Sequence, residues 1–139
     1  MSQDKAGPAT NDQAAGELRT ATLTVTEAAI HAYAELTDDF NPIHLDAQFA
    51  ATTPMGRQIA HGTMSLCLLW QWVGLNFPAR TLGELHLDAR FVKPVHIGDR
   101  LVASGDPDPD VPGQWRIRVR AQDGADRVIG TLRTGSSPD

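Results

Sequence analysis

The chain has 139 residues, of which 41% are hydrophobic and 21% charged, so it can bury a core and has a soluble, globular composition. Its 12 Lys and Arg against 17 Asp and Glu give a formal net charge of −5, which argues against a nucleic-acid-binding protein. No apolar run reaches the roughly 20 residues that cross a bilayer. The N-terminus carries no apolar segment typical of a secretory signal, and the single cysteine excludes an internal disulfide. We therefore expect one cytoplasmic domain over residues 17–135, with a disordered leader at 1–16 and a frayed end at 136–139.

The first elements are a strand, a helix and a loop. Residues 18–25 alternate apolar and polar side chains and are rich in threonine, which predicts a short strand. Thr26 is a candidate N-cap, and apolar side chains recur at helical spacing behind it, which predicts a helix over residues 27–36. Residues 37–44 are expected to form a loop because Pro42 lacks a backbone N–H and disfavours helix before it.

A long apolar helix is predicted over residues 63–77, after a short helix that Asp46 can cap and a loop over residues 52–60. Apolar side chains occupy nearly every face of this segment, whereas a surface helix shows one polar face. The pattern therefore predicts a helix that is buried on most sides, with Cys67 as a small hydrophobic core residue. A domain of this size can bury such a helix by wrapping a sheet around it.

The second half of the chain supplies the predicted sheet. Alternating patterns over residues 85–91, 100–104, 115–120 and 128–133 indicate four successive strands, with a loop rich in Pro and Asp at 106–113. Strands that follow helices favour an α+β fold with an antiparallel sheet. A curved sheet around one central helix fits this order best, and a cystatin-like or ferredoxin-like domain is the alternative.

The candidate chemistry lies in two short segments. Asp39 and His44 flank a turn at Asn41–Pro42 that can bring their side chains together, and a carboxylate facing an imidazole can hold a water and move its proton. His61 and Gly62 precede the long helix, where backbone N–H groups are unpaired and glycine lets a ligand carbonyl approach. Such an N–H would stabilise charge that develops on a thioester oxygen. Each residue alone has an ordinary structural explanation, so the combination carries the hypothesis.

These segments resemble a known family. The blocks are Asp39-Phe-Asn-Pro-Ile-His44, Ile59-Ala-His-Gly-Thr-Met64 and Phe91-Val-Lys-Pro-Val-His-Ile-Gly-Asp99. They resemble the MaoC-like (R)-specific enoyl-CoA hydratases and the related (3R)-hydroxyacyl-carrier-protein dehydratases, over residues 18–135. The resemblance implies a hot-dog fold, in which an antiparallel sheet wraps a long central helix. It also implies a dimer, either of two copies or with a homologous chain, whose substrate channel lies at the subunit interface.

The resemblance further implies (R)-specific hydration of a trans-2-enoyl thioester, or the reverse dehydration of an (R)-3-hydroxyacyl thioester, in fatty-acid or polyketide type metabolism. Asp39 and His44 match the catalytic pair that activates one water. Gly62 matches the backbone donor to the thioester carbonyl, Asn41 holds the catalytic loop, and His61 supports the geometry of that loop. The substrate is carried on CoA or on the phosphopantetheine of a carrier protein, and neither a metal nor a redox cofactor is expected.

One position departs from the pattern. Trp70 stands where some members of the family carry an active-site serine, so it either faces the channel and reshapes the acyl pocket or belongs to the core. Three other hypotheses stay open: a hot-dog acyl thioesterase, the catalytic subunit of a heterodimeric acyl-carrier-protein dehydratase, and a non-enzymatic subunit that shapes a partner's channel.

The remaining polar residues give weaker signals. The spacing of His31, His86 and His96 does not fit a metal site. No glycine-rich phosphate loop follows a strand, which argues against a nucleotide cofactor. A basic stripe over one strand is expected to be a solvated face paired with nearby acids rather than a phosphate site: Arg116, Arg118 and Arg120. Two further residues are alternative phosphate contacts: Arg57 and Lys93.

Overall fold

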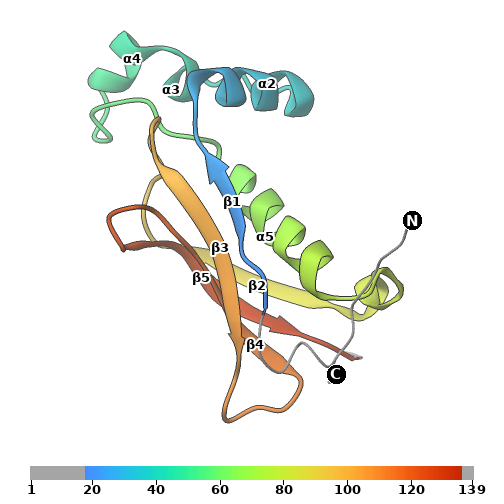
Figure 1. The fold of residues 1–139 in the computed structure, drawn as a ribbon. Coiled ribbons are helices and arrows are strands. Elements are labelled where there is room, and N and C mark those ends of the chain that lie inside the picture. Colours follow the sequence, from blue (N-terminus) through green and yellow to red (C-terminus); the bar gives the residue numbers. More distant parts are fainter. Residues whose placement is uncertain (1–17, 136–139) are drawn as a thin grey trace.

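The structure, a computed structural model, describes residues 18–135, so the expected leader at 1–16 and the frayed end at 136–139 lie outside the described residues. Its centre is a five-stranded antiparallel sheet in the order β1-β3-β4-β5-β2 (Figure 1). The strands are β1 (Ala21–Thr24), β2 (His86–Phe91), β3 (Arg100–Pro107), β4 (Gln114–Arg120) and β5 (Asp126–Arg133). The predicted strands are therefore all present, with β1 shorter and β3 longer than their sequence patterns indicate.

Four α-helices and one 3₁₀-helix accompany the sheet. Three short helices lie together at one end of the sheet, at the top of Figure 1, and the long helix α5 lies against one face. The helices are α2 (Glu27–Thr37), α3 (Pro42–Leu45), α4 (Ala47–Ala51), α5 (Gly62–Asn76) and the 3₁₀-helix η2 (Ala79–Glu84). Within residues 18–135, no helix combines the length and the apolar content needed to cross a membrane.

Side-chain caps fix the starts of the short helices. The Thr26 hydroxyl accepts a hydrogen bond from the amide of Ala29 at 3.0 Å, as the sequence predicts. The Asp46 carboxylate accepts hydrogen bonds from two amides in the first turn of α4. The predicted loop over residues 37–44 contains α3, because a proline is well suited to the first position of a helix even though it disfavours helix before it.

The sheet-facing side of α5 forms the centre of the core. Leu69 and Val73 are fully buried and Trp72 is 1% exposed. Trp72 fits closely over Gly105 of β3, where an added Cβ would lie 2.8 Å from the indole ring. The core is completed by buried residues from α2, β3, β4 and β5: Ile30, Leu101, Val119, Val128 and Leu132.

The expectation that α5 is buried on most sides is wrong for the single chain. Trp70 is 41% exposed and Leu75 is 42% exposed, and Cys67 is also exposed rather than a core residue. The sheet covers one face of α5, so the helix presents a second apolar face to its surroundings. Trp70 is therefore not part of the core of this chain.

Strands β2 and β5 approach each other closely at Gly130, which pairs with Ala89. A Cβ at position 130 would overlap the carbonyl oxygen of Asp88 and lie 2.9 Å from the Cα of Ala89. This approach sets the position of β2, whose last residue, Phe91, lies beside the first residue of α5.

Candidate active site

The end of α2 places Asp39. Asp38 adopts a left-handed conformation (φ 58°), and the amide of Asp39 donates to the carbonyl oxygen of Ala34 at 3.0 Å, which closes the helix. The chain then turns, and the carboxylate of Asp39 accepts a hydrogen bond from the amide of Asn41 at 3.2 Å. Asp39 is exposed, so its carboxylate is accessible for chemistry.

The turn that follows places His44. The side chain of Asn41 caps α3 by accepting from the amide of Ile43 at 3.0 Å, and His44 lies in the single turn of that helix. Nδ1 of His44 lies 2.8 Å from the carbonyl oxygen of Ile59. A carbonyl oxygen can only accept, so Nδ1 carries a proton, and in the neutral imidazole Nε2 holds the lone pair. His44 is thereby set up as a base at Nε2.

His61 links the two segments. Its Nε2 lies 3.0 Å from the carbonyl oxygen of Asp39, to which it must donate, and its ring stacks on that of His44 with 3.9 Å between centroids. Tyr33 packs against the other side with its edge, at 5.0 Å. Nδ1 of His61 is buried and has no hydrogen-bond partner among residues 18–135. His61 therefore joins the backbone at Asp39 to the ring of His44, and its role as a support of this loop stays a prediction.

The structure thus brings three predicted residues together. One ligand-type atom from each of Asp39, His44 and His61 lies within 4.8 Å of the other two. The two rings are stacked, with 25° between their planes. A carboxylate oxygen and imidazole nitrogens at this spacing can move a proton, and atoms of these types can also bind a metal ion.

A hollow of about 360 Å³ opens beside His44. Gly62 lines it at the N-terminus of α5, where amides of the first helical turn have no partner within the helix. Phe91 lies close by, with its ring 3.4 Å from where a Cβ of Gly62 would stand. The other lining residues include Met55, Ile59, Ser65, Lys93 and Val95. The hollow therefore combines the imidazole of His44, a helix N-terminus and apolar walls.

Trp70 does not line this hollow. It lies in a neighbouring groove between α5 and β2, with Leu66 and Leu87. Phe91 borders both the hollow and the groove, so it separates Trp70 from His44.

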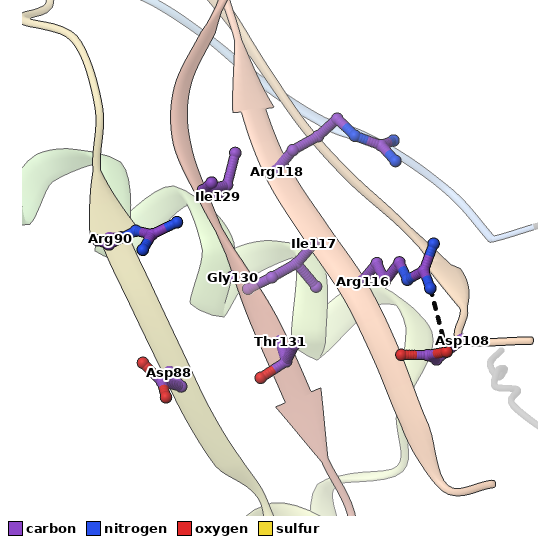
Figure 2. Close-up of a pocket in the computed structure, with 9 residues that line it drawn as sticks. All are labelled: Asp88, Arg90, Asp108, Arg116, Ile117, Arg118, Ile129, Gly130 and Thr131. Atoms are coloured by element: carbon purple, nitrogen blue, oxygen red, sulfur yellow. Dashed lines mark hydrogen bonds and ion pairs between the residues drawn. The ribbon is translucent and has the colours of Figure 1, made fainter. Parts of the chain in front are cut away.

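A larger hollow, of about 480 Å³, lies on the outer face of the sheet (Figure 2). It is lined by residues of β2, β4 and β5, away from α5, and three arginines point toward its rim: Arg90, Arg116 and Arg118. Arg116 pairs with Asp108 and Asp110, and Arg118 pairs with Asp106 at 3.3 Å. Arg120, further along β4, pairs with Asp126 at 2.7 Å. The prediction that this basic stripe pairs with nearby acids is confirmed.

Sequence reasoning missed the residues that hold His44. Besides Ile59, the side chain of Gln58 donates to the carbonyl oxygen of His44 at 2.8 Å. No local pattern signals these contacts, because they join residues 14 and 15 positions apart. Ser65 was also missed, although its place one turn after His61 on an apolar helix puts both on one helix face.

Of the two alternative phosphate contacts, Lys93 lines the hollow, and Arg57 lies near His96. Burial lowers the pKa of His96 below 6.5, and the charge of Arg57 lowers it further. His96 forms an isolated antiparallel bridge with Ile59, which lines the hollow.

Comparisons with known proteins agree with this arrangement. The chain is 40% identical over 76 residues to an (R)-specific enoyl-CoA hydratase of Aeromonas caviae, covering 55% of this chain and 57% of that protein. It is 33% identical over 95 residues to a 3-hydroxybutyryl-CoA dehydratase of Methylorubrum extorquens, covering 68% of this chain and 60% of that protein. The chain therefore spans less than two thirds of the length of these curated relatives.

Solved structures show the same fold. An unliganded R-hydratase of Pseudomonas aeruginosa superimposes with a TM-score of 0.71 at 29% identity, over 86% of this chain and 80% of that one. The (R)-hydratase of Aeromonas caviae involved in PHA biosynthesis gives 0.67 at 30% identity, over 84% and 92%. The prediction of an α+β hot-dog fold is confirmed. A family model described as MaoC like domain matches residues 10–124, and the chain belongs to this family.

Proposed function

We propose that this chain is a hydro-lyase that adds water to a trans-2-enoyl thioester with (R) specificity, or removes it from an (R)-3-hydroxyacyl thioester. The observation that carries the proposal is the pairing of Asp39 with His44, whose carboxylate oxygen and ring nitrogen lie within 4.8 Å of each other beside an apolar hollow. The relatives named as enoyl-CoA hydratase and 3-hydroxybutyryl-CoA dehydratase support the same class of reaction.

In the proposed reaction, Asp39 and His44 hold one water between them. Nε2 of His44 is available to accept a proton, because Nδ1 donates to Ile59. The hydroxyl of the water bonds to C3 of the substrate, the C2–C3 π bond breaks, and the proton is delivered to C2. Water supplies both added groups, so the step is redox-neutral and needs no redox cofactor.

The thioester carbonyl is placed at Gly62. Charge builds on this oxygen as water adds to C3, and the N-terminus of a 15-residue helix stabilises negative charge there. The absence of a side chain lets the carbonyl approach the backbone between Gly62 and Phe91. CoA or the phosphopantetheine of a carrier protein would carry the acyl group, and we propose that the chain acts in the cytoplasm, in fatty-acid or polyketide type metabolism.

The exposed face of α5 supports a dimer of two copies of this chain. Trp70 and Leu75 on α5 and Phe91 on β2 are 41%, 42% and 52% exposed, and they leave a large apolar surface uncovered. β2 is an edge strand whose second edge has no strand partner within residues 18–135. A second copy docked here would cover both features and close the groove beside Phe91.

The dimer predicts that Trp70→Arg weakens self-association, because it places a charge in the apolar contact. Light scattering coupled to gel filtration should show a dimer for the wild type and for Gln48→Arg, which adds the same charge at an exposed polar position of α4. A monomeric wild type would instead favour assembly with a homologous chain.

An absorbance assay with crotonyl-CoA, run beside a thiol reagent, tests the reaction itself. We expect loss of the conjugated enoyl absorbance without release of thiol, and an (R)-3-hydroxybutyryl product on chiral analysis. Thiol release would establish the thioesterase alternative. If neither signal changes with CoA thioesters or with thioesters of a carrier protein, the proposed activity is wrong.

A further inference from the structure

A buried ion pair lies behind the wall of the catalytic hollow. A carboxylate oxygen of Asp99 lies 3.4 Å from a guanidinium nitrogen of Arg127, and the two side chains are only 5% and 6% exposed. Arg127 also makes a two-pronged contact with Asp123, at 3.1 and 3.2 Å. Replacing a buried ion pair by apolar side chains often leaves stability unchanged or improved, so stability alone does not account for this pair.

The pair holds both ends of one wall segment, residues 92–99. At one end, the carbonyl oxygen of Arg127 accepts from the amides of Val92 and Lys93, at 2.9 and 3.4 Å. At the other end, the carboxylate of Asp99 accepts from the amide of His96 at 3.0 Å. Arg127 thus ties down the start of the segment through its backbone and its end through its side chain.

This wall segment in turn holds the residue that orients His44. The amide of Ala60 donates to the carbonyl oxygen of Val95 at 2.7 Å, and Ile59 forms its bridge with His96. The carbonyl oxygen of Ile59 accepts the Nδ1 proton of His44 at 2.8 Å. A continuous chain of contacts therefore runs from Arg127 through Asp99, His96 and Ile59 to His44.

We infer that Asp99 and Arg127 are positioning residues that fix the tautomer and orientation of His44 through the carbonyl of Ile59. A histidine that acts as a base at Nε2 needs its proton on Nδ1, and the partner of the other ring nitrogen sets which tautomer is present. Movement of Ile59 would leave Nδ1 without its acceptor and allow the ring to carry its proton on Nε2 instead. The inference rests on the proposed function only for its kinetic test.

The test compares Asp99→Asn and the double variant Asp99→Asn/Arg127→Met with the control Asp126→Asn. The double variant removes both buried charges together and leaves no unpaired charge in the core. It therefore serves as the test variant if Asp99→Asn alone does not fold. Asp126 lies next to Arg127 in the chain but pairs with Arg120. Asp126→Asn is therefore the same substitution as Asp99→Asn but leaves the wall segment untouched.

The first readout is independent of activity. Long-range ¹H–¹⁵N spectra of the imidazoles separate the two neutral tautomers, and His44→Gln identifies the signal of His44 among the five histidines. We expect the Nδ1–H tautomer in the wild type and in Asp126→Asn, and a shift toward the Nε2–H tautomer in the two test variants. A folded test variant that keeps the wild-type tautomer overturns the inference, whether or not the proposed reaction is correct.

The second readout is kinetic, at a temperature where each variant is fully folded. Displacement of a catalytic group by about 1 Å can lower the rate about 100-fold, so we expect kcat for crotonyl-CoA to fall by about 10- to 100-fold. KM should stay within about threefold, because the walls that bind substrate remain in place. An equal change in kcat in Asp126→Asn, or a loss confined to KM, would contradict a positioning role.

Discussion

The corner that holds Asp39, His44 and His61 and the outer face of the sheet each combine titratable side chains with a hollow. They differ in whether the charged side chains form ion pairs. On the outer face, the hollow is larger, about 480 Å³ against 360 Å³, and Arg116 and Arg118 at its rim pair with acids. In the corner, Asp39 lies beside His44 and His61 and, within the described part of the chain, forms no ion pair with Lys or Arg.

The volume of a hollow therefore does not identify the candidate active site. Paired surface charges contribute little stability and offer no free group to a ligand, whereas an accessible carboxylate beside an oriented imidazole can move a proton. We therefore expect substitutions of Asp39 and His44 to affect activity, and substitutions of the paired arginines on the outer face to affect neither activity nor folding strongly.

The largest expected effect comes from Asp39→Asn. The change keeps the shape and the hydrogen bond from Asn41 but removes the carboxylate, and loss of a general acid–base group typically costs about 100- to 10,000-fold in kcat. Steady-state kinetics with crotonyl-CoA measures it. Asp38→Asn is the matched control, because asparagine also tolerates the left-handed conformation at that position. Substantial activity in Asp39→Asn would remove Asp39 from the mechanism.

A smaller effect is expected from Gly62→Ala. The added methyl would fill the approach between the backbone and Phe91, so kcat/KM should fall by about tenfold or more through misplacement of the thioester. The melting temperature should not drop, since alanine favours helix over glycine. Gly83→Ala, in the 3₁₀-helix η2 with open space around it, should retain wild-type kinetics. Equal kinetics for the two variants would place the carbonyl elsewhere.

On the outer face, Arg118→Gln should change little. Its ion pair with Asp106 involves a carboxylate that is 69% exposed, so the free energy of unfolding should fall by about 1 kcal/mol or less. Urea denaturation measures the change, and kcat with crotonyl-CoA should stay within about twofold of the wild type. A large loss of activity would assign the outer hollow a part in catalysis.

The smallest effect concerns pH. Burial, followed by the charge of Arg57, lowers the pKa of His96 below 6.5, so the unfolded chain takes up a proton at His96 before the folded chain does. The contribution of His96 to the free energy of unfolding is therefore full above pH 6.5 and declines as the pH falls through the lower, folded pKa. Denaturation curves across this range should show that the free energy of unfolding of the wild type, minus that of His96→Gln, becomes smaller as the pH falls below 6.5. A difference that grows toward acid pH would contradict the sign of the shift.

The part of the site that lies within a single turn could be predicted from the sequence. Asp39, Asn41 and His44 are placed by a helix end, a side-chain cap and a proline, which are local signals. The hot-dog sheet followed from strand alternation together with the family resemblance. These predictions depend on residues close in the chain, where physical preferences are strong.

The contacts between distant segments could not be predicted. Ile59 holds His44 through a backbone carbonyl, which every residue type possesses, so its identity carries no signal. The exposed face of α5 was predicted to be buried because an apolar pattern does not distinguish a core from a surface that a second chain can cover. The same ambiguity left Trp70 between channel and core. The structure excludes the core and places Trp70 in the groove between α5 and β2, and its part in the acyl channel stays a prediction.

The close approach of β2 and β5 at Gly130 limits which substitutions this position can accept during evolution. Any side chain at position 130 would push β2 away from β5 and carry Phe91 away from the start of α5. The position lies in β5, with β2, β3 and β4 between it and His44 in the sequence, and it has no functional group of its own. We expect related chains that keep this strand pairing to keep a glycine here for its lack of a side chain alone, although the position cannot move a proton.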